Sequence, residues 1–264
     1  FERIKFMKEK IQIIELIRTK KYADAEDLVN LLLKKGHIDH ELFFLSGVIK
    51  ANQKKYIEAK NLLEKFLQKS NEHFDGNLNL AGCYHEMGDF ENAILFYKKC
   101  TALDPNNAEP FTRLAMCYRF KRHYEEAIIN LNISLKIQST KEKVLLLGNI
   151  YKENGNFEKA QIHFEDVIQS YPDDFDGKLA LANLEIDKGN IDKANSLFQN
   201  LLSKPSISPE ILLRIKIDLG KILMAKGEYS RAIDEYLSIG ASNPNIAYNL
   251  ALCYLFLQKY RMIK

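Results

Sequence analysis

The chain has 264 residues, of which 46% are hydrophobic and 28% charged, and its formal net charge is +3. This composition is typical of a globular protein, and the length suits one elongated domain or two compact ones. A nearly neutral charge argues against nucleic-acid binding, because phosphate recognition usually concentrates basic residues on one surface.

Two further classes of protein are disfavoured by residue usage. No apolar stretch approaches the roughly 18 residues that a membrane-spanning helix needs, so we expect no membrane insertion. The four cysteines are too sparse for a disulfide scaffold, and none forms a Cys-x-x-Cys pair. We therefore expect the protein in the cytoplasm or in another reducing intracellular compartment.

A six-residue phrase recurs along the chain: two small or polar residues, a large side chain, and an alanine three residues after it. It appears first as Lys20-Lys21-Tyr22-Ala23-Asp24-Ala25 and more clearly as Gly88-Asp89-Phe90-Glu91-Asn92-Ala93. The alanines of its seven copies are Ala25, Ala59, Ala93, Ala127, Ala160, Ala194 and Ala232, with successive gaps of 34, 34, 34, 33, 34 and 38 residues. A fixed period of this length predicts stacked units of supersecondary structure.

Each repeat predicts a helix, a turn and a second helix. In the first helix, a pattern such as Leu80-Ala81-x-x-Tyr84 forms one wide apolar stripe. The alanine lets the second helix cross the first closely. Four repeats end the first helix with a glycine, because a left-handed residue is needed there; these are Gly88, Gly155, Gly189 and Gly227.

Three segments depart from the repeat. In the first repeat, Ile13, Ile14 and Ile17 fit the stripe only if the turn is one residue longer. Four extra residues lie around 204–209, which predicts a longer loop or an extra helical turn, with Ser208 as N-cap and Pro209 at the first helical position. An eighth unit begins at residue 245 and stops at residue 264, so we expect the array to continue in a longer protein.

With this phrase and this period, the chain resembles the tetratricopeptide repeat family, and the resemblance covers nearly the whole chain. It implies an all-α fold, a right-handed α-solenoid of about seven to eight helical hairpins. The array would fill residues 1–264, with repeats at about 6–38, 40–73, 74–107, 108–140, 141–173, 175–206 and 209–244 and a partial unit at 245–264.

The resemblance also implies a function. In the family, the first helices of successive hairpins line a concave groove that binds peptide or helix segments of other proteins. We therefore expect a protein-interaction scaffold or adaptor in a multiprotein assembly. The alternative is a substrate-recruiting arm of a larger enzyme, such as a glycosyltransferase, whose catalytic domain lies outside this chain; the full-length reading frame would decide between the two.

Counting from each repeated alanine gives the residues expected to face the groove. They mix amides, cations and a thioether, and asparagine can both donate to and accept from a peptide bond. The simpler reading for each one is ordinary solvated helix surface. The candidate partner-binding residues are Asn79, Arg113, Met116, Arg119, Asn149, Lys152, Asn183, Lys221 and Asn249.

Sharper partner hypotheses fare less well. Positions within a repeat are numbered so that the repeated alanine is position 20. Cochaperones of the family clamp a terminal carboxylate with a lysine at position 5. Here that position holds Leu78, Thr112, Leu145 and Leu179, so we expect no chaperone carboxylate clamp. Acids at position 2 favour a basic partner or, more simply, complement the helix dipole; they are Glu41, Asp75, Glu109, Glu142 and Asp176. Basic pairs at three turns favour an acidic partner or solvated turns; they are Lys20-Lys21, Lys54-Lys55 and Lys121-Arg122.

No pattern for catalysis or metal binding stands out. The sequence has no glycine-rich phosphate loop, nucleophile elbow or paired catalytic carboxylates. Cys83, Cys117 and Cys253 share one repeat position, where cysteine serves as a small buried apolar residue. His37 and His40 lack a partner at ligand spacing. We therefore expect no catalytic residue, no metal and no cofactor, and a protein that is not an enzyme.

Overall fold

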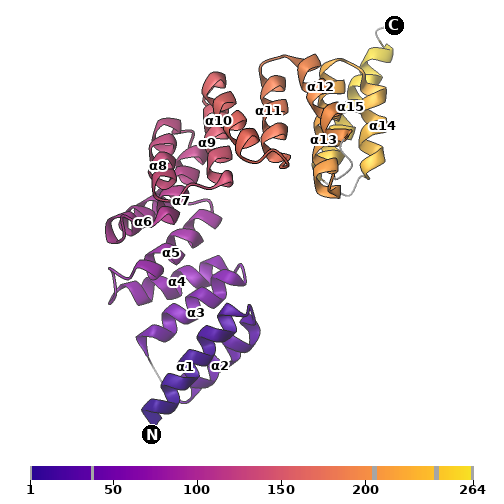
Figure 1. The fold of residues 1–264 in the computed structure, drawn as a ribbon. Coiled ribbons are helices and arrows are strands. Elements are labelled where there is room, and N and C mark those ends of the chain that lie inside the picture. The colour runs from indigo at the N-terminus through magenta and orange to yellow at the C-terminus, as the bar shows by residue number, and fades with distance from the viewer. Residues whose placement is uncertain (1, 37–38, 204–206, 241–243, 263–264) are drawn as a thin grey trace. The chain divides into compact units, whose positions relative to one another are not determined.

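The computed structural model describes residues 2–36, 39–203, 207–240 and 244–262. These residues form helices and turns, with no strand among them (Figure 1). The helices are α1 (Glu2–Arg18), α2 (Tyr22–Lys34), α3 (His40–Asn52), α4 (Tyr56–Leu67), α5 (Phe74–Glu86), α6 (Phe90–Leu103), α7 (Ala108–Phe120), α8 (Tyr124–Ile137), α9 (Lys141–Glu153), α10 (Phe157–Ser170), α11 (Asp176–Asp187), α12 (Ile191–Leu202), α13 (Pro209–Ala225), α14 (Tyr229–Ile239) and α15 (Pro244–Met262).

The helices divide into two units. Unit 1 spans residues 1–139 and contains α1 to α8; unit 2 spans residues 140–264 and contains α9 to α15. Within each unit, consecutive helices pair into hairpins, and each hairpin packs against the next one along the chain (Figure 1). The predicted all-α stack of helical hairpins is therefore confirmed, while the repeat boundaries given above stay a prediction.

The repeated alanines lie where two helices cross most closely. All seven are fully buried, at 0% exposure. Glycines in the first helices allow similar approaches: a Cβ added at Gly148 would lie 2.5 Å from the Phe164 ring, and one at Gly220 would lie 2.3 Å from Tyr236. Small residues at the crossings let the large side chains of the partner helix fill the core.

The turns within the hairpins share one backbone geometry. The four predicted glycines are left-handed, with φ between 76° and 80°. In the first, second and fourth hairpins the same position holds Lys20, Lys54 and Arg122, with φ of 59°, 62° and 59°. The basic turn residues thus take a conformation that disfavours any residue with a Cβ.

The prediction of a longer first turn is wrong. The first hairpin runs from Arg18 through left-handed Lys20 to Tyr22, just as the second runs from Asn52 through Lys54 to Tyr56. Fully buried Ile13 lies where the second hairpin has Gly47, twelve residues before the repeated alanine. A larger side chain fills the crossing, so the stripe shifts without any change in the turn.

The start of α13 follows its prediction. Ser208 is the N-cap, its hydroxyl accepts a hydrogen bond of 3.3 Å from the backbone N–H of Ile211, and Pro209 begins the helix. Helix α13 has 17 residues against 13 in α9, so extra residues lengthen the helix. Lys204, Pro205 and Ser206 lie outside the described residues, as do His37 and the side chains after Gln258. Of the helices that are described, none combines the length and the apolar character needed to cross a membrane.

Candidate functional site

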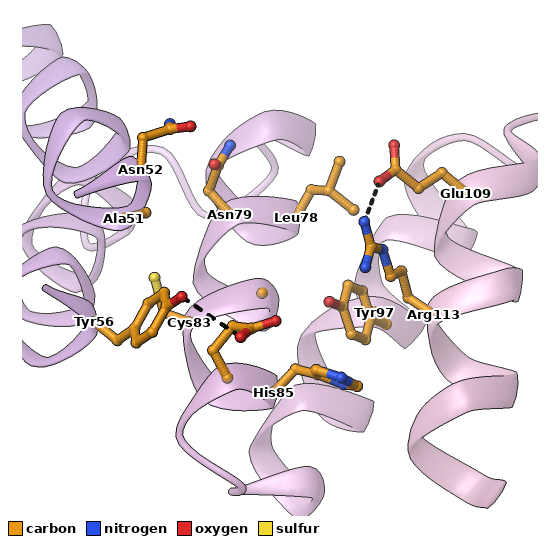
Figure 2. Close-up of a pocket in the computed structure, with 12 residues that line it drawn as sticks. Ala51, Asn52, Tyr56, Leu78, Asn79, Cys83, His85, Tyr97, Glu109 and Arg113 are labelled. Atoms are coloured by element: carbon orange, nitrogen blue, oxygen red, sulfur yellow. Dashed lines mark hydrogen bonds and ion pairs between the residues drawn. The ribbon is translucent and has the colours of Figure 1, made fainter. Parts of the chain in front are cut away.

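The first helices of successive hairpins in unit 1 share a surface with a hollow in it, which we name the Gly82 cavity. It has a volume of about 340 Å³. Figure 2 shows Asn52 and Tyr56 on one side of it and Glu109 and Arg113 on the other. Its lining comes from α3 to α7 and consists of Ala51, Asn52, Tyr56, Leu78, Asn79, Gly82, Cys83, His85, Glu86, Tyr97, Glu109 and Arg113.

The two outer walls of the cavity carry polar side chains held by local bonds. The Tyr56 hydroxyl donates to Oε2 of Glu86 at 3.5 Å, which is a long contact (Figure 2). On the other wall, the Arg113 guanidinium lies 3.3 Å from Oε1 of Glu109, one helical turn earlier on α7. Both partners of this pair are about half exposed, so the pair adds little stability and its members can turn toward a ligand.

Asparagines bring both donors and acceptors to the cavity. Oδ1 of Asn52 accepts from the Tyr22 hydroxyl at 2.9 Å, and its amide donates to the carbonyl of Val48 at 2.8 Å. The Asn79 amide donates one bond, of 2.8 Å, to the carbonyl of Asp75 on its own helix. Asn79 is therefore held in place while it keeps hydrogen-bonding capacity for a ligand.

The inner wall is aromatic and uncharged. Burial lowers the pKa of His85, whose Nδ1 lies 3.2 Å from Sγ of Cys117 and whose ring meets the edges of Phe90 and Phe120. Tyr97 is only 2% exposed, and burial raises its pKa far above the usual range. At neutral pH, both His85 and Tyr97 are therefore neutral.

Two of the predicted groove residues of unit 1 come together at this cavity, namely Asn79 and Arg113. Met116 and Arg119 also lie on α7 and are partly buried, but they do not line it. The sequence analysis missed Tyr56, Glu86 and Tyr97. For Glu109, the row of acids predicts a basic partner or a role with the helix dipole. Tyr56 and Tyr97 lie on second helices, which a register count on the first helices does not include.

In unit 2, most of the predicted groove residues bond to the neighbouring hairpin. Nζ of Lys152 lies 2.9 Å from Oδ2 of Asp187 on α11. Asn183 on α11 donates to Oδ2 of Asp218 on α13 at 3.0 Å. Lys221, which also lies on α13, donates to Oδ1 of the same carboxylate at 2.7 Å. Asn249 bonds to Tyr236, and Asn149 is partly buried on α9. All five remain candidates, although four have part of their bonding capacity engaged.

A second cavity of about 520 Å³ lies on the same face of unit 1, and the sequence analysis missed it. Lys10, which is 8% exposed, binds Asp39 at 2.8 Å and also contacts Glu41. Counting back from Ala25 in the first repeat, as was done for the later repeats, would have identified Lys10 and Ile14. The lining of this second cavity consists of Lys10, Ile14, Asp39, His40, Glu41, Phe44, Leu45, Phe66, Ser70 and His73.

The acids at position 2 are largely occupied within the protein. Glu41 contacts Lys10 and Glu109 pairs with Arg113. Oxygens of Asp176 lie 3.1 Å from Nζ of Lys141 and 3.0 Å from Nη1 of Arg214. Pairing with cations of the same helix or of neighbouring helices weakens the interpretation of these acids as a ladder for a basic partner.

The cysteines are buried and unreactive. All four are free thiols in the core, and burial raises the pKa of Cys83 to about 11 and those of Cys100 and Cys117 to about 12. Thiols with such pKa values stay protonated at neutral pH and neither attack electrophiles nor bind metals readily. Across the described residues, no three histidine, cysteine or carboxylate side chains gather into a metal-binding group.

Comparison with known proteins agrees with this architecture. Three family models, each described as Tetratricopeptide repeat, match the chain at residues 75–107, at 96–129, and at 145–209 and 179–247. Together they cover more than half of its length. A crystal structure of a tetratricopeptide repeat protein from Parabacteroides merdae superposes with a TM-score of 0.76 at 19% identity, covering 94% of this chain and 98% of that one.

Two longer proteins are similar in sequence. Human Anaphase-promoting complex subunit 7 is 25% identical over 232 residues, which are 87% of this chain and 40% of the relative. Intraflagellar transport protein 70A of Danio rerio is 24% identical over 209 residues, which are 78% of this chain and 26% of the relative. The chain thus spans less than half the length of these relatives.

Proposed function

Because the chain belongs to the tetratricopeptide repeat family, we propose that it is a non-enzymatic scaffold segment that binds extended or helical parts of partner proteins. The observation that carries this proposal is the Gly82 cavity. It lies on the first-helix face of unit 1 and combines an apolar wall with amides, carboxylates and a guanidinium. Such a mixture suits the side chains and backbone of a peptide.

The sequence relatives support a place in a larger assembly. One is named as a subunit of the anaphase-promoting complex and the other as an intraflagellar transport protein. We propose that this chain likewise works in a multiprotein complex. Four buried free thiols fit a reducing intracellular compartment, which forms part of the proposal.

The second candidate function is that of a substrate-recruiting arm of a larger enzyme. It is kept because the chain spans less than half the length of its relatives, so that a complete protein of similar size would have room for a further domain. Both functions use the same binding face. The full-length reading frame separates them, since a catalytic domain outside this chain would favour the arm.

The proposal is tested with a library of phage-displayed random dodecapeptides. We expect the purified chain to select peptides that share a motif. Leu78 lines the cavity. The variant Leu78→Arg should weaken the binding of these peptides to the chain by about tenfold or more, equivalent to about 1.4 kcal/mol. Affinity is measured by fluorescence anisotropy and folding by circular dichroism.

The variant Leu95→Arg is the matched control. Leu95 belongs to the second helix of the same hairpin, is 51% exposed and does not line the cavity. Its replacement should leave the affinity unchanged. If no peptide is selected, or if both variants weaken binding equally, the first-helix face of unit 1 is not the binding surface.

A further inference from the structure

The presence of a glycine at position 82 is not explained by the fold. Six of the twelve glycines have a positive φ, and at five others an added Cβ would lie 3.0 Å or less from a neighbouring side chain. Gly82 belongs to neither group: it lies inside α5, and the nearest atom to an added Cβ is the Tyr97 hydroxyl, 3.9 Å away. Within a helix, glycine is less favourable than alanine. What the missing side chain leaves behind is the hollow of the Gly82 cavity.

The Tyr97 hydroxyl lies below this hollow. Tyr97 is 2% exposed and lines the cavity, and its hydroxyl is the atom nearest to a Cβ added at Gly82, so the oxygen faces the hollow. A hydroxyl in the lining of a cavity bonds to water or to a polar group of a ligand. The hydroxyl can accept as well as donate, which prepares the floor of the cavity for a polar group of a ligand.

The charges around the cavity favour a cation. Its lining holds two carboxylates, those of Glu86 and Glu109, and one guanidinium, that of Arg113. Arg113 is paired with Glu109, whereas the described contact of Glu86 is the long one from Tyr56. The lining therefore has a net negative charge, and the charge on Glu86 is poorly compensated. His85 adds no positive charge, because burial lowers its pKa.

We propose that the Gly82 cavity binds a lysine or arginine side chain of an extended partner segment. This inference rests on the function proposed above. The aliphatic part of the side chain passes over Gly82 beside Leu78, and its charged end donates to Glu86 and to the Tyr97 oxygen. The Tyr56 ring, at the start of α4, offers a face for a cation. An acidic side chain would meet two carboxylates, and an apolar one would leave Tyr97 without a partner.

The test is a positional-scanning peptide library, in which one position at a time is fixed as lysine, arginine, glutamine, glutamate or leucine. We expect the parent chain to prefer lysine or arginine at one position by about tenfold, which corresponds to one charge-assisted contact. The variant Gly82→Leu should lose this preference and melt no lower than the parent, since its Cβ has room.

Two carboxylate variants guard against an indirect effect of the leucine. Glu86→Gln should reduce the preference for a base, whereas Glu126→Gln, which removes the same charge from an exposed position on α8, should leave it unchanged. If peptides bind without a basic position, or if the preference survives Gly82→Leu, the cavity is not a cation subsite while the proposed function stands. If the parent binds no peptide at any position, both proposals fail.

Discussion

The side-chain amide of Asn183 on α11 donates a hydrogen bond of 3.0 Å to Oδ2 of Asp218 on α13. Its second N–H bonds to the carbonyl of Leu179 at 3.1 Å, so both amide hydrogens are used within the protein. Asp218 is 8% exposed and also accepts from Lys221 at 2.7 Å. For a partner, Asn183 therefore keeps only its oxygen, and its role in unit 2 is first to join two hairpins.

This relationship predicts a stability effect. Asp218→Ala should lower the free energy of unfolding by about 1–3 kcal/mol, because it leaves one N–H of the partly buried Asn183 amide without an acceptor. Urea denaturation measures it. The control Asp187→Ala breaks the pair with Lys152, in which Asp187 is 45% exposed, and should cost less than about 1 kcal/mol. Equal losses in the two variants would contradict the structural role of Asp218.

The left-handed basic residues at three turns predict stabilising substitutions. Lys54→Gly and Arg122→Gly should each raise the free energy of unfolding by about 0.5–1 kcal/mol, because glycine adopts a positive φ without a steric penalty. The reciprocal change Gly88→Ala places a Cβ in the same conformation and should be destabilising. Should Lys54→Gly melt below the parent, the lysine side chain contributes a contact that outweighs the backbone strain.

Two glycines within helices should respond in opposite directions to the same change. In Gly148→Ala, the new Cβ would lie 2.5 Å from the buried ring of Phe164, and overpacking should cost about 1–3 kcal/mol. In Gly82→Ala, the nearest atom is 3.9 Å away, and the better helix propensity should add about 0.5–1 kcal/mol. Thermal melts followed by circular dichroism compare them. A destabilised Gly82→Ala would show that the glycine has a packing role after all.

Two histidines predict how stability depends on pH. Burial lowers the pKa of His85 and of His163 below the ordinary value of 6.5, even though Asp166 opposes the shift at His163. The unfolded chain therefore binds protons at a higher pH than the folded one, and the free energy of unfolding should fall as pH falls through 6.5. The double variant His85→Gln and His163→Gln should show a smaller decrease across this window in urea titrations. An unchanged slope would mean that other groups cause it.

Local patterns in the sequence predicted the repeat units and most of their turns. The period of the repeated alanine placed the close crossings, glycine marked four left-handed turns, and Ser208 with Pro209 marked the start of α13. These features depend on residues that are near one another in the chain, since backbone geometry, caps and stripes act over one or two helical turns. The first turn was mispredicted because a large Ile13 replaced a small residue without changing the local geometry.

The contacts of the predicted binding residues depend on how the hairpins pack against one another. Asn79 and Arg113 line one cavity, but its floor comes from Tyr97 on a second helix and its outer wall from Tyr56 on the preceding hairpin. In unit 2, Asn183 meets Asp218 across 35 residues of sequence. A register count tells which face a side chain occupies, but its bonding partners come from neighbouring hairpins, whose distance and rotation are set by how the core side chains pack.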